Sequence, residues 1–332
     1  MFNHLPDSFL QMNTIFISIM IEALPFVLIG VFIAGLIQMF VSERFIASVM
    51  PKNKFLAVIV GSLIGVFFPS CECGIVPIVR NLLAKGVPLH AGIAFMLTAP
   101  IINPVVLFST YVAFGSQWEV PILRVVGSLV VAIIVGVLLA YFYKGEGLKE
   151  KFFAYEKAAQ EVDNQDGSAS LTAPIVKINA ITTLENTHDE HDHTHHHKDM
   201  SFGSKLWHTA QHAVDEFFSV GKYLVFGALI AAFMQTYIKT ATLISIGHGP
   251  ILSILLMMSL AFILSLCSEA DAFIGASFRS IFSTQSIVAF LVFGPMFDIK
   301  NLMMMFASFK TKFVLFLVAS VTIIVFIYAL VI

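Results

Sequence analysis

Charged residues are scarce in this sequence. Asp, Glu, Lys and Arg make up 12% of the 332 residues and 58% are hydrophobic, whereas a soluble domain has roughly 25% charged residues. The mean hydropathy is +0.89. This composition predicts a multi-pass protein of the cell membrane in contact with lipid. A formal net charge of −2 and the lack of a basic stripe argue against a nucleic-acid partner.

Cysteine is also rare, and no nucleotide-binding loop is present. Three cysteines, an odd number, argue against a disulfide framework and favour reactive or metal-binding thiols. The pattern G-x-x-x-x-G-K-[ST] is absent, which excludes ATP use through a P-loop of this chain. We therefore expect a secondary transporter and not an enzyme. A thiol oxidoreductase of the membrane is less favoured, because no second cysteine pair accompanies the C-x-C.

Eight apolar runs are present, and a membrane helix needs about 20 such residues. The runs lie near 14–41, 55–79, 87–114, 120–143, 216–238, 251–274, 285–308 and 311–332. They predict an all-α polytopic fold of about eight transmembrane helices. The runs divide the chain into a first membrane repeat (1–143), a polar, His-rich and largely disordered loop (144–204) and a second membrane repeat (205–332).

The central loop contains a dense run of imidazoles, "THDEHDHTHHHKD". Two further histidines, His208 and His212, follow at a spacing of four residues, which places both on one face of a helix. Such side chains suit zinc and similar ions, so a bound zinc or other soft metal is the one cofactor that the sequence suggests. The alternatives are a solvated low-complexity loop and the polar face of an interfacial helix. The candidate metal ligands are His188, His191, His193, His195, His196, His197, His208 and His212.

The two membrane halves resemble each other. The segment 27–41 aligns without gaps with 224–238, and 93–103 aligns with 288–298; "PSCECG" and "LCSEAD" fall opposite each other between these blocks. Repeats with Gly- or Pro-interrupted spans are typical of secondary transporters. Four spans per repeat would make the halves parallel, and a re-entrant segment would make them inverted. The sequence leaves both arrangements open.

Proline and glycine interrupt several runs, and polar side chains gather at the interruptions. We expect helix breaks at Pro69, Gly74, Pro77, Pro100, Pro104, Gly294 and Pro295. Polar side chains at membrane depth usually face the protein interior and usually have a function. The predicted substrate-binding residues are Cys71, Glu72, Cys73, Asn103, Cys267, Glu269, Asp271 and Asp298. The alternative is structural, with buried carboxylates hydrogen-bonded between helices and cysteines that only pack.

The segment Cys71-Glu72-Cys73 indicates a soft ligand. Two thiolates one residue apart can share Cu(I), Zn(II) or a thiophilic metalloid, and they are too close for an unstrained disulfide. Glu72 could supply charge or carry a proton. This chemistry favours ion-coupled transport of a soft metal or metalloid.

The segment "FFPSCECGIVPIVRNLLAKGVPLHAGIAFMLTAPIINPVVL" resembles the signature of the predicted permease family that contains the ArsP-type organoarsenical efflux permeases and the YraQ/YcgR-type proteins. The resemblance implies an inner-membrane permease of about eight spans, a role in efflux, and Cys71 and Cys73 as substrate ligands. It also implies a second small membrane subunit; a homo-oligomer is the alternative. The His-rich loop departs from what arsenical export requires, so zinc transport or a metal-sensing subunit remains the alternative function.

Overall fold

The computed structural model describes residues 7–40, 50–51, 53–67, 72–143, 147–148, 202–237 and 249–332. In the first half its helices are α1 (Asp7–Phe40), α3 (Lys54–Ile64), η1 (Gly65–Phe67), α4 (Glu72–Ala84), α5 (Leu89–Ile102), α6 (Pro104–Ala113) and α7 (Glu119–Phe142). In the second half they are α9 (Phe202–Tyr237), α11 (Pro250–Leu264), α12 (Ser268–Ser277), η3 (Phe278–Ser280), α13 (Thr284–Met296), α14 (Ile299–Ser308) and α15 (Thr311–Val331). The described residues contain no β-strand beyond one isolated bridge, and the all-α prediction is confirmed.

The prediction of eight spans is not confirmed. Helices occupy all eight apolar runs, but four described segments are long and apolar enough to cross a membrane: Ser8–Ile33, Glu119–Phe142, Thr284–Ser308 and Thr311–Val331. A fifth span results if α5 and α6, which are bent by 41° at their junction, are counted as one. Several runs are therefore divided into helices too short to cross alone.

The helices α3 and α4 form a hairpin that returns to the side it enters from. Ala57, near the start of α3, lies in one apolar cluster with Leu82 near the end of α4, and with Val87 and Ala91 beyond it. An 11-residue helix such as α3 is about 16 Å long, about half of a hydrocarbon core. The hairpin α3–α4 therefore reaches the middle of the protein and turns back.

The helices α11 and α12 form the corresponding hairpin of the second half. The hydroxyls of Ser253, near the start of α11, and Ser286, near the start of α13, share a hydrogen bond of 2.7 Å. Gly275, near the end of α12, also faces α13, where a Cβ at this position would contact Leu291 and Ile287. The entry and the exit of this hairpin therefore lie together as well.

The two hairpins enter from opposite ends of α7. Lys54, the first residue of α3, donates from Nζ to the carbonyl of Ala140 near the end of α7, over 3.1 Å. Arg279, just after α12, donates to Gln117 just before α7 begins, over 2.9 Å. Because α7 is long enough to cross the membrane, the hairpins α3–α4 and α11–α12 approach the centre from opposite sides.

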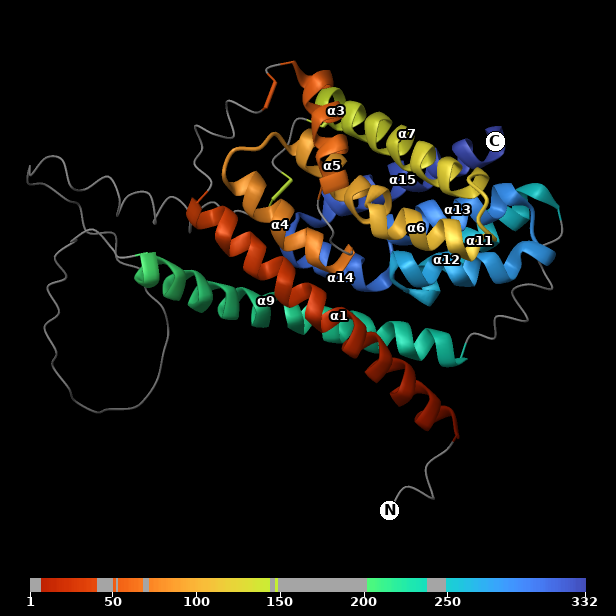
Figure 1. Cartoon of the computed structure of the whole chain (residues 1–332), viewed down its shortest axis with the longest axis horizontal. Helices are drawn as coiled ribbons and strands as arrows, with labels where there is room; N and C mark the ends of the chain where they lie inside the picture. Colours follow the sequence, from red (N-terminus) through yellow and green to blue (C-terminus); the bar gives the residue numbers. More distant parts are fainter. Residues whose placement is uncertain are drawn as a thin grey trace, which may run out of the picture.

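The two halves of the chain are inverted relative to each other. The helices α1 and α9 lie side by side and run in opposite directions (Figure 1). The same holds for α7 and α15, because Tyr328 at the end of α15 donates to the carbonyl of Leu123 at the start of α7, over 2.8 Å. With a re-entrant hairpin in each half, equivalent helices point in opposite directions, which is the inverted type of transporter repeat.

The centre of the protein is formed by α5 and α13, which pack against each other. Every residue from Ala91 to Ile102 and from Ser286 to Met296 is buried. These are the two segments that the internal duplication aligns. Each is followed by a break and a short helix, α6 or α14, so that both breaks lie inside the protein.

Several predicted helix breaks are wrong in position. Gly74 and Pro77 lie inside α4, Pro100 inside α5, and Gly294 and Pro295 inside α13. A proline removes one N–H donor, but a helix can continue where the freed carbonyl finds another donor. Gly74 is used for close packing instead, because a Cβ on Gly30 of α1 would lie 2.6 Å from its Cα.

The breaks of the two central helices lie two to three residues beyond the prolines inside them. They fall at Asn103 in the first half and at Phe297 and Asp298 in the second. Pro104 does mark the break, as the first residue of α6, where its missing N–H would have no helical partner. Pro69 lies outside the described residues.

Candidate functional site

The second helices of the two hairpins meet end to end. The helix α4 begins at Glu72 and α12 begins at Ser268, and the Ser268 hydroxyl donates to Glu72 Oε2 over 3.4 Å. Both side chains are buried, with 1% of each residue exposed. The N-terminal ends of both helices, which carry partial positive charge, therefore face one region between the two halves.

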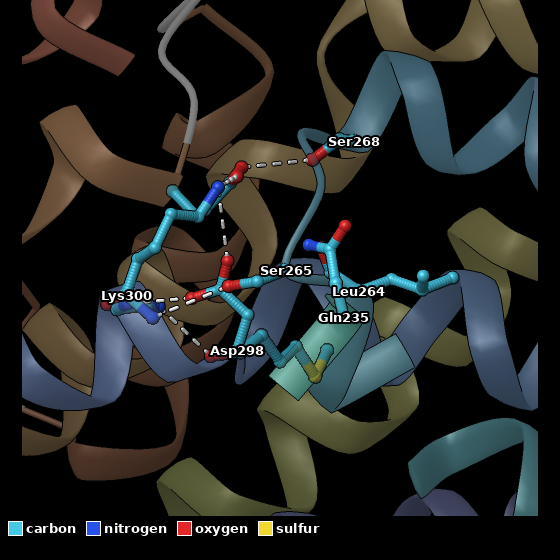
Figure 2. A network of polar contacts seen from close by, with 9 residues as sticks. Gln235, Leu264, Ser265, Ser268, Asp298 and Lys300 are labelled. Carbon is cyan, nitrogen blue, oxygen red and sulfur yellow. Dashed lines mark hydrogen bonds and ion pairs between the residues drawn. The ribbon is translucent and has the colours of Figure 1, made fainter. Parts of the chain in front are cut away.

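Lys300 of α14 is the cation of this region. Its Nζ lies 3.8 Å from Glu72 Oε1 and 3.4 Å from Asp298 Oδ2. Its backbone N–H donates to Ser265 Oγ over 3.5 Å. Figure 2 shows Lys300, Asp298, Ser265 and Ser268 gathered where the hairpins meet. Lys300 therefore contacts both hairpins, Glu72 in the first and Ser265 in the second.

The turn between α11 and α12 has a strained backbone. Ser265, directly after α11, has a φ of 50° in the left-handed region, which is unfavourable for residues other than glycine. Gln235 of α9 donates to the carbonyl of Leu264, the last residue of α11, over 2.6 Å. This bond satisfies a carbonyl that the end of the helix leaves open, and it helps to hold the strained turn in place.

Arg124 of α7 donates hydrogen bonds to residues of both halves of the chain. Its Nη2 donates to the carbonyl of Ser268 over 3.0 Å, its Nε to the carbonyl of Leu291 over 3.1 Å, and its Nη1 to Thr110 Oγ1 over 2.7 Å. The Leu291 carbonyl is available because Pro295, four residues later, has no N–H. A predicted helix breaker thus provides the acceptor that holds a buried arginine.

Asn103 and Asp298, which the duplication pairs, occupy equivalent positions. Each is the residue before a short helix and accepts from that helix: Asn103 Oδ1 from the N–H of Val105 and Val106, and Asp298 Oδ1 from the N–H of Asn301. Both are therefore helix caps. Asp298 in addition presents its Oδ2 to Lys300.

A thiol lies at the start of the second helix in each hairpin. Cys73 of α4 is buried, and Lys300 is among its electrostatic neighbours. Cys267, directly before α12, is partly buried and interacts with Glu22 of α1 and with Glu72. We call the group Glu72, Cys73, Cys267, Ser268, Asp298 and Lys300 the tip site. It contains predicted residues from both repeats, joined by Lys300, which was not predicted.

The structure describes only some of the remaining predicted site residues. Glu269 and Asp271 lie in the first turn of α12. Cys71 and the loop histidines lie outside the described residues, as do the side chains of His208 and His212. Within the part of the chain that is described, no three His, Cys, Asp or Glu side chains form a group that could hold a metal ion.

The sequence comparisons identify the family of this chain. Residues 8–332 match the model of the ArsP_1 family, described as "Predicted permease". The chain belongs to this family. The permease is 55% identical to UPF0718 protein YcgR of Bacillus subtilis over 319 residues, 96% of each chain. No solved structure matches the chain.

Two further relatives extend the comparison. The permease is 46% identical over 331 residues, 100% of its length and 98% of the relative's, to a protein of Streptococcus mutans whose name describes a subunit of a two-component membrane permease complex. It is 24% identical to UPF0718 protein MJ0584 of Methanocaldococcus jannaschii over 141 residues, 42% of this chain and 38% of the relative. The expectation of a multi-pass membrane permease is confirmed.

Proposed function

We propose that the permease exports a soft metal or metalloid species by secondary, ion-coupled transport through the tip site. The observation that carries the proposal is the meeting of two re-entrant hairpins from opposite sides, each with a thiol at its tip. A site between two inverted elements can be opened to either side by small movements of one half against the other. Thiolates are the ligands that soft ions prefer.

The polar groups of the tip site suit coupling to a second ion. Glu72, Asp298 and Lys300 form a buried ion-pair network that crosses from one half of the chain to the other. A movement that separates the halves must break the Glu72–Lys300 contact, and a bound cation or proton can replace Lys300 at the carboxylate. The network therefore links ion binding to the position of the hairpins.

Replacing the thiols one at a time should abolish most transport. The variants Cys71→Ser, Cys73→Ser and Cys267→Ser are compared with wild type in cells given Zn²⁺, Cu⁺, arsenite or methylarsenite, and metal accumulation is measured. A lost ligand thiol should weaken apparent affinity by about tenfold or more, since changes around metal ligands already cost about 10–100-fold. The control is Ser320→Ala, whose hydroxyl is exposed on α15 and bonds to its own helix.

The four substrates separate the candidate functions. Lower accumulation of arsenite or methylarsenite in cells with the wild-type permease, reversed by the cysteine changes, supports metalloid export. An effect on Zn²⁺ alone would favour the second candidate, zinc transport with the His-rich loop as a buffer. Accumulation that no cysteine variant changes, for any of the four, would contradict a thiol substrate site.

We further propose that the permease works with a second membrane subunit. The support is the name of the S. mutans relative, which describes such a complex. A homo-oligomer is the alternative. The mass of the complex purified from its native membrane distinguishes the two.

A further inference from the structure

Asp271 is buried, and none of the described residues donates a hydrogen bond to its carboxylate. It lies in the first turn of α12 with 1% of its surface exposed. Neither carboxylate oxygen accepts a hydrogen bond from any described residue. An ionised carboxylate that is buried and not hydrogen-bonded is strongly unfavourable, and such a group usually takes up a proton and becomes neutral.

The charges around Asp271 are mixed. Two cations face it, Arg124 of α7 and Lys300 of α14, and two carboxylates, Asp298 directly before α14 and Glu22 of α1. Arg124 forms no ion pair with it within 4 Å in the described structure, because the Arg124 donors bond to Ser268, Leu291 and Thr110. Lys300 pairs with Glu72 and Asp298 instead.

Asp271 also differs from the other two carboxylates that are 1% exposed. Glu72 accepts from the Ser268 hydroxyl and lies 3.8 Å from Lys300 Nζ, and Asp298 accepts from the N–H of Asn301 and lies 3.4 Å from Lys300 Nζ. Among the described residues Asp271 has neither a hydrogen bond nor an ion pair for its carboxylate. Of the three it is therefore the one whose burial most favours a bound proton.

The surroundings of Asp271 also stabilise its ionised form once the site opens. Its position at the positive end of α12 favours a negative charge, and Arg124 is the cation that acts on it most strongly. On the α13 side Gly294 leaves space, because a Cβ there would lie 2.8 Å from Asp271 Oδ2. The residue therefore has a neutral state when enclosed and a stabilised charged state when exposed.

We propose that Asp271 carries the coupling proton of the permease. When the hairpin α11–α12 opens to one side, the O–H bond of Asp271 breaks and the proton passes to water, while Arg124 pairs with the carboxylate. When the hairpin opens to the other side, water supplies a proton and Arg124 returns to the carbonyls of Ser268 and Leu291. The proposal rests on the proposed function for its link to transport, but its chemistry can be tested without any substrate.

The experiment is infrared difference spectroscopy of the full-length permease in liposomes, titrated from mildly acidic to alkaline buffer in H₂O and D₂O. Wild type should show the carbonyl stretch of a protonated, deuterium-sensitive carboxylic acid that disappears as the buffer becomes alkaline. Asp271→Asn, which is neutral and nearly isosteric, should lack this band. The matched control Glu72→Gln should keep it.

A band that remains in Asp271→Asn, or the lack of such a band in wild type, overturns the proposal. If Asp271→Asn does not fold, Gly294→Ala provides the second measurement, since its methyl group contacts Oδ2 and should shift the band; an unshifted band then overturns the proposal. Both measurements use the protein alone. A failure here therefore leaves the thiol-dependent transport assay unaffected, and a failure of that assay leaves this result standing.

Discussion

Arg124→Met should destabilise the permease by about 3 kcal/mol or more, because it leaves three buried acceptors without their donor and each unsatisfied buried polar group costs about 1–3 kcal/mol. The carbonyl of Leu291 would lose the donor that replaces the missing N–H of Pro295, and Thr110 would lose a bond as well. Three contacts that connect α7 to α6, α12 and α13 would be broken together. The measurement is the temperature at which half of the detergent-purified protein leaves its monodisperse chromatographic peak.

Arg124→Lys tests whether charge alone is sufficient. A lysine ammonium is a point charge, and it cannot direct donors at three separated acceptors as a planar guanidinium does. We expect Arg124→Lys to be intermediate between wild type and Arg124→Met. The control is Arg279→Gln, at an exposed arginine bonded to Gln117, with an expected effect within about 0.5 kcal/mol. Equal stability of Arg124→Met and this control would refute the role of Arg124.

The second large effect is expected for Lys300→Met. This change removes the cation between Glu72 and Asp298, two carboxylates that are each 1% exposed, and it should cost about 3–5 kcal/mol. Glu72→Gln should cost less, because Lys300 keeps its 3.4 Å contact with Asp298. The two changes differ because Lys300→Met leaves two buried carboxylates without a cation, whereas Glu72→Gln leaves Lys300 paired with Asp298.

The double variant Glu72→Gln/Lys300→Met tests this coupling. Removing both partners restores the charge balance, so the double variant should be more stable than the sum of the single effects predicts, by about 1 kcal/mol or more. Thermal stability of all four proteins completes the cycle. A double variant whose loss equals the sum of the two single losses would show that Glu72 and Lys300 do not interact in the folded permease.

Much of the fold was predictable from hydrophobicity. Each apolar run contains helix in the part of the chain that the structure describes. The span count was not confirmed, because length and apolarity alone cannot distinguish a continuous helix from two short helices that turn back. The clustering of Ala57 with Val87 and Ala91, which brings the entry and the exit of the first hairpin together, joins residues that are at least 30 positions apart.

The candidate site was predicted in part. Asn103 and Asp298 were identified from their position in the duplication, and both prove to be helix caps at the two breaks. Arg124 and Lys300 were missed although a signal existed: Arg124 is the one charged residue within the apolar run 120–143, and ionisable residues at such positions are usually functional. Which carbonyls accept hydrogen bonds from Arg124 depends on how the two halves pack against each other.

The relative direction of the two repeats could not be predicted from the sequence either. Basic residues are divided almost evenly between the two sets of loops, so the positive-inside rule gives no orientation. The structure decides the relative direction through contacts such as Tyr328 with Leu123. The inverted direction then follows from the antiparallel pairs α1–α9 and α7–α15, together with one hairpin in each half.

The central claim is that the two hairpins enter the membrane from opposite sides and meet at the tip site. The direct test is labelling with a membrane-impermeant maleimide in a cysteine-free background, with one new cysteine at the base of each hairpin, Lys85→Cys after α4 or Ser280→Cys after α12. Labelling of intact cells and of inverted vesicles should modify the two positions from opposite faces of the membrane. Modification of both from the same face would contradict the inverted hairpins and the tip site between them.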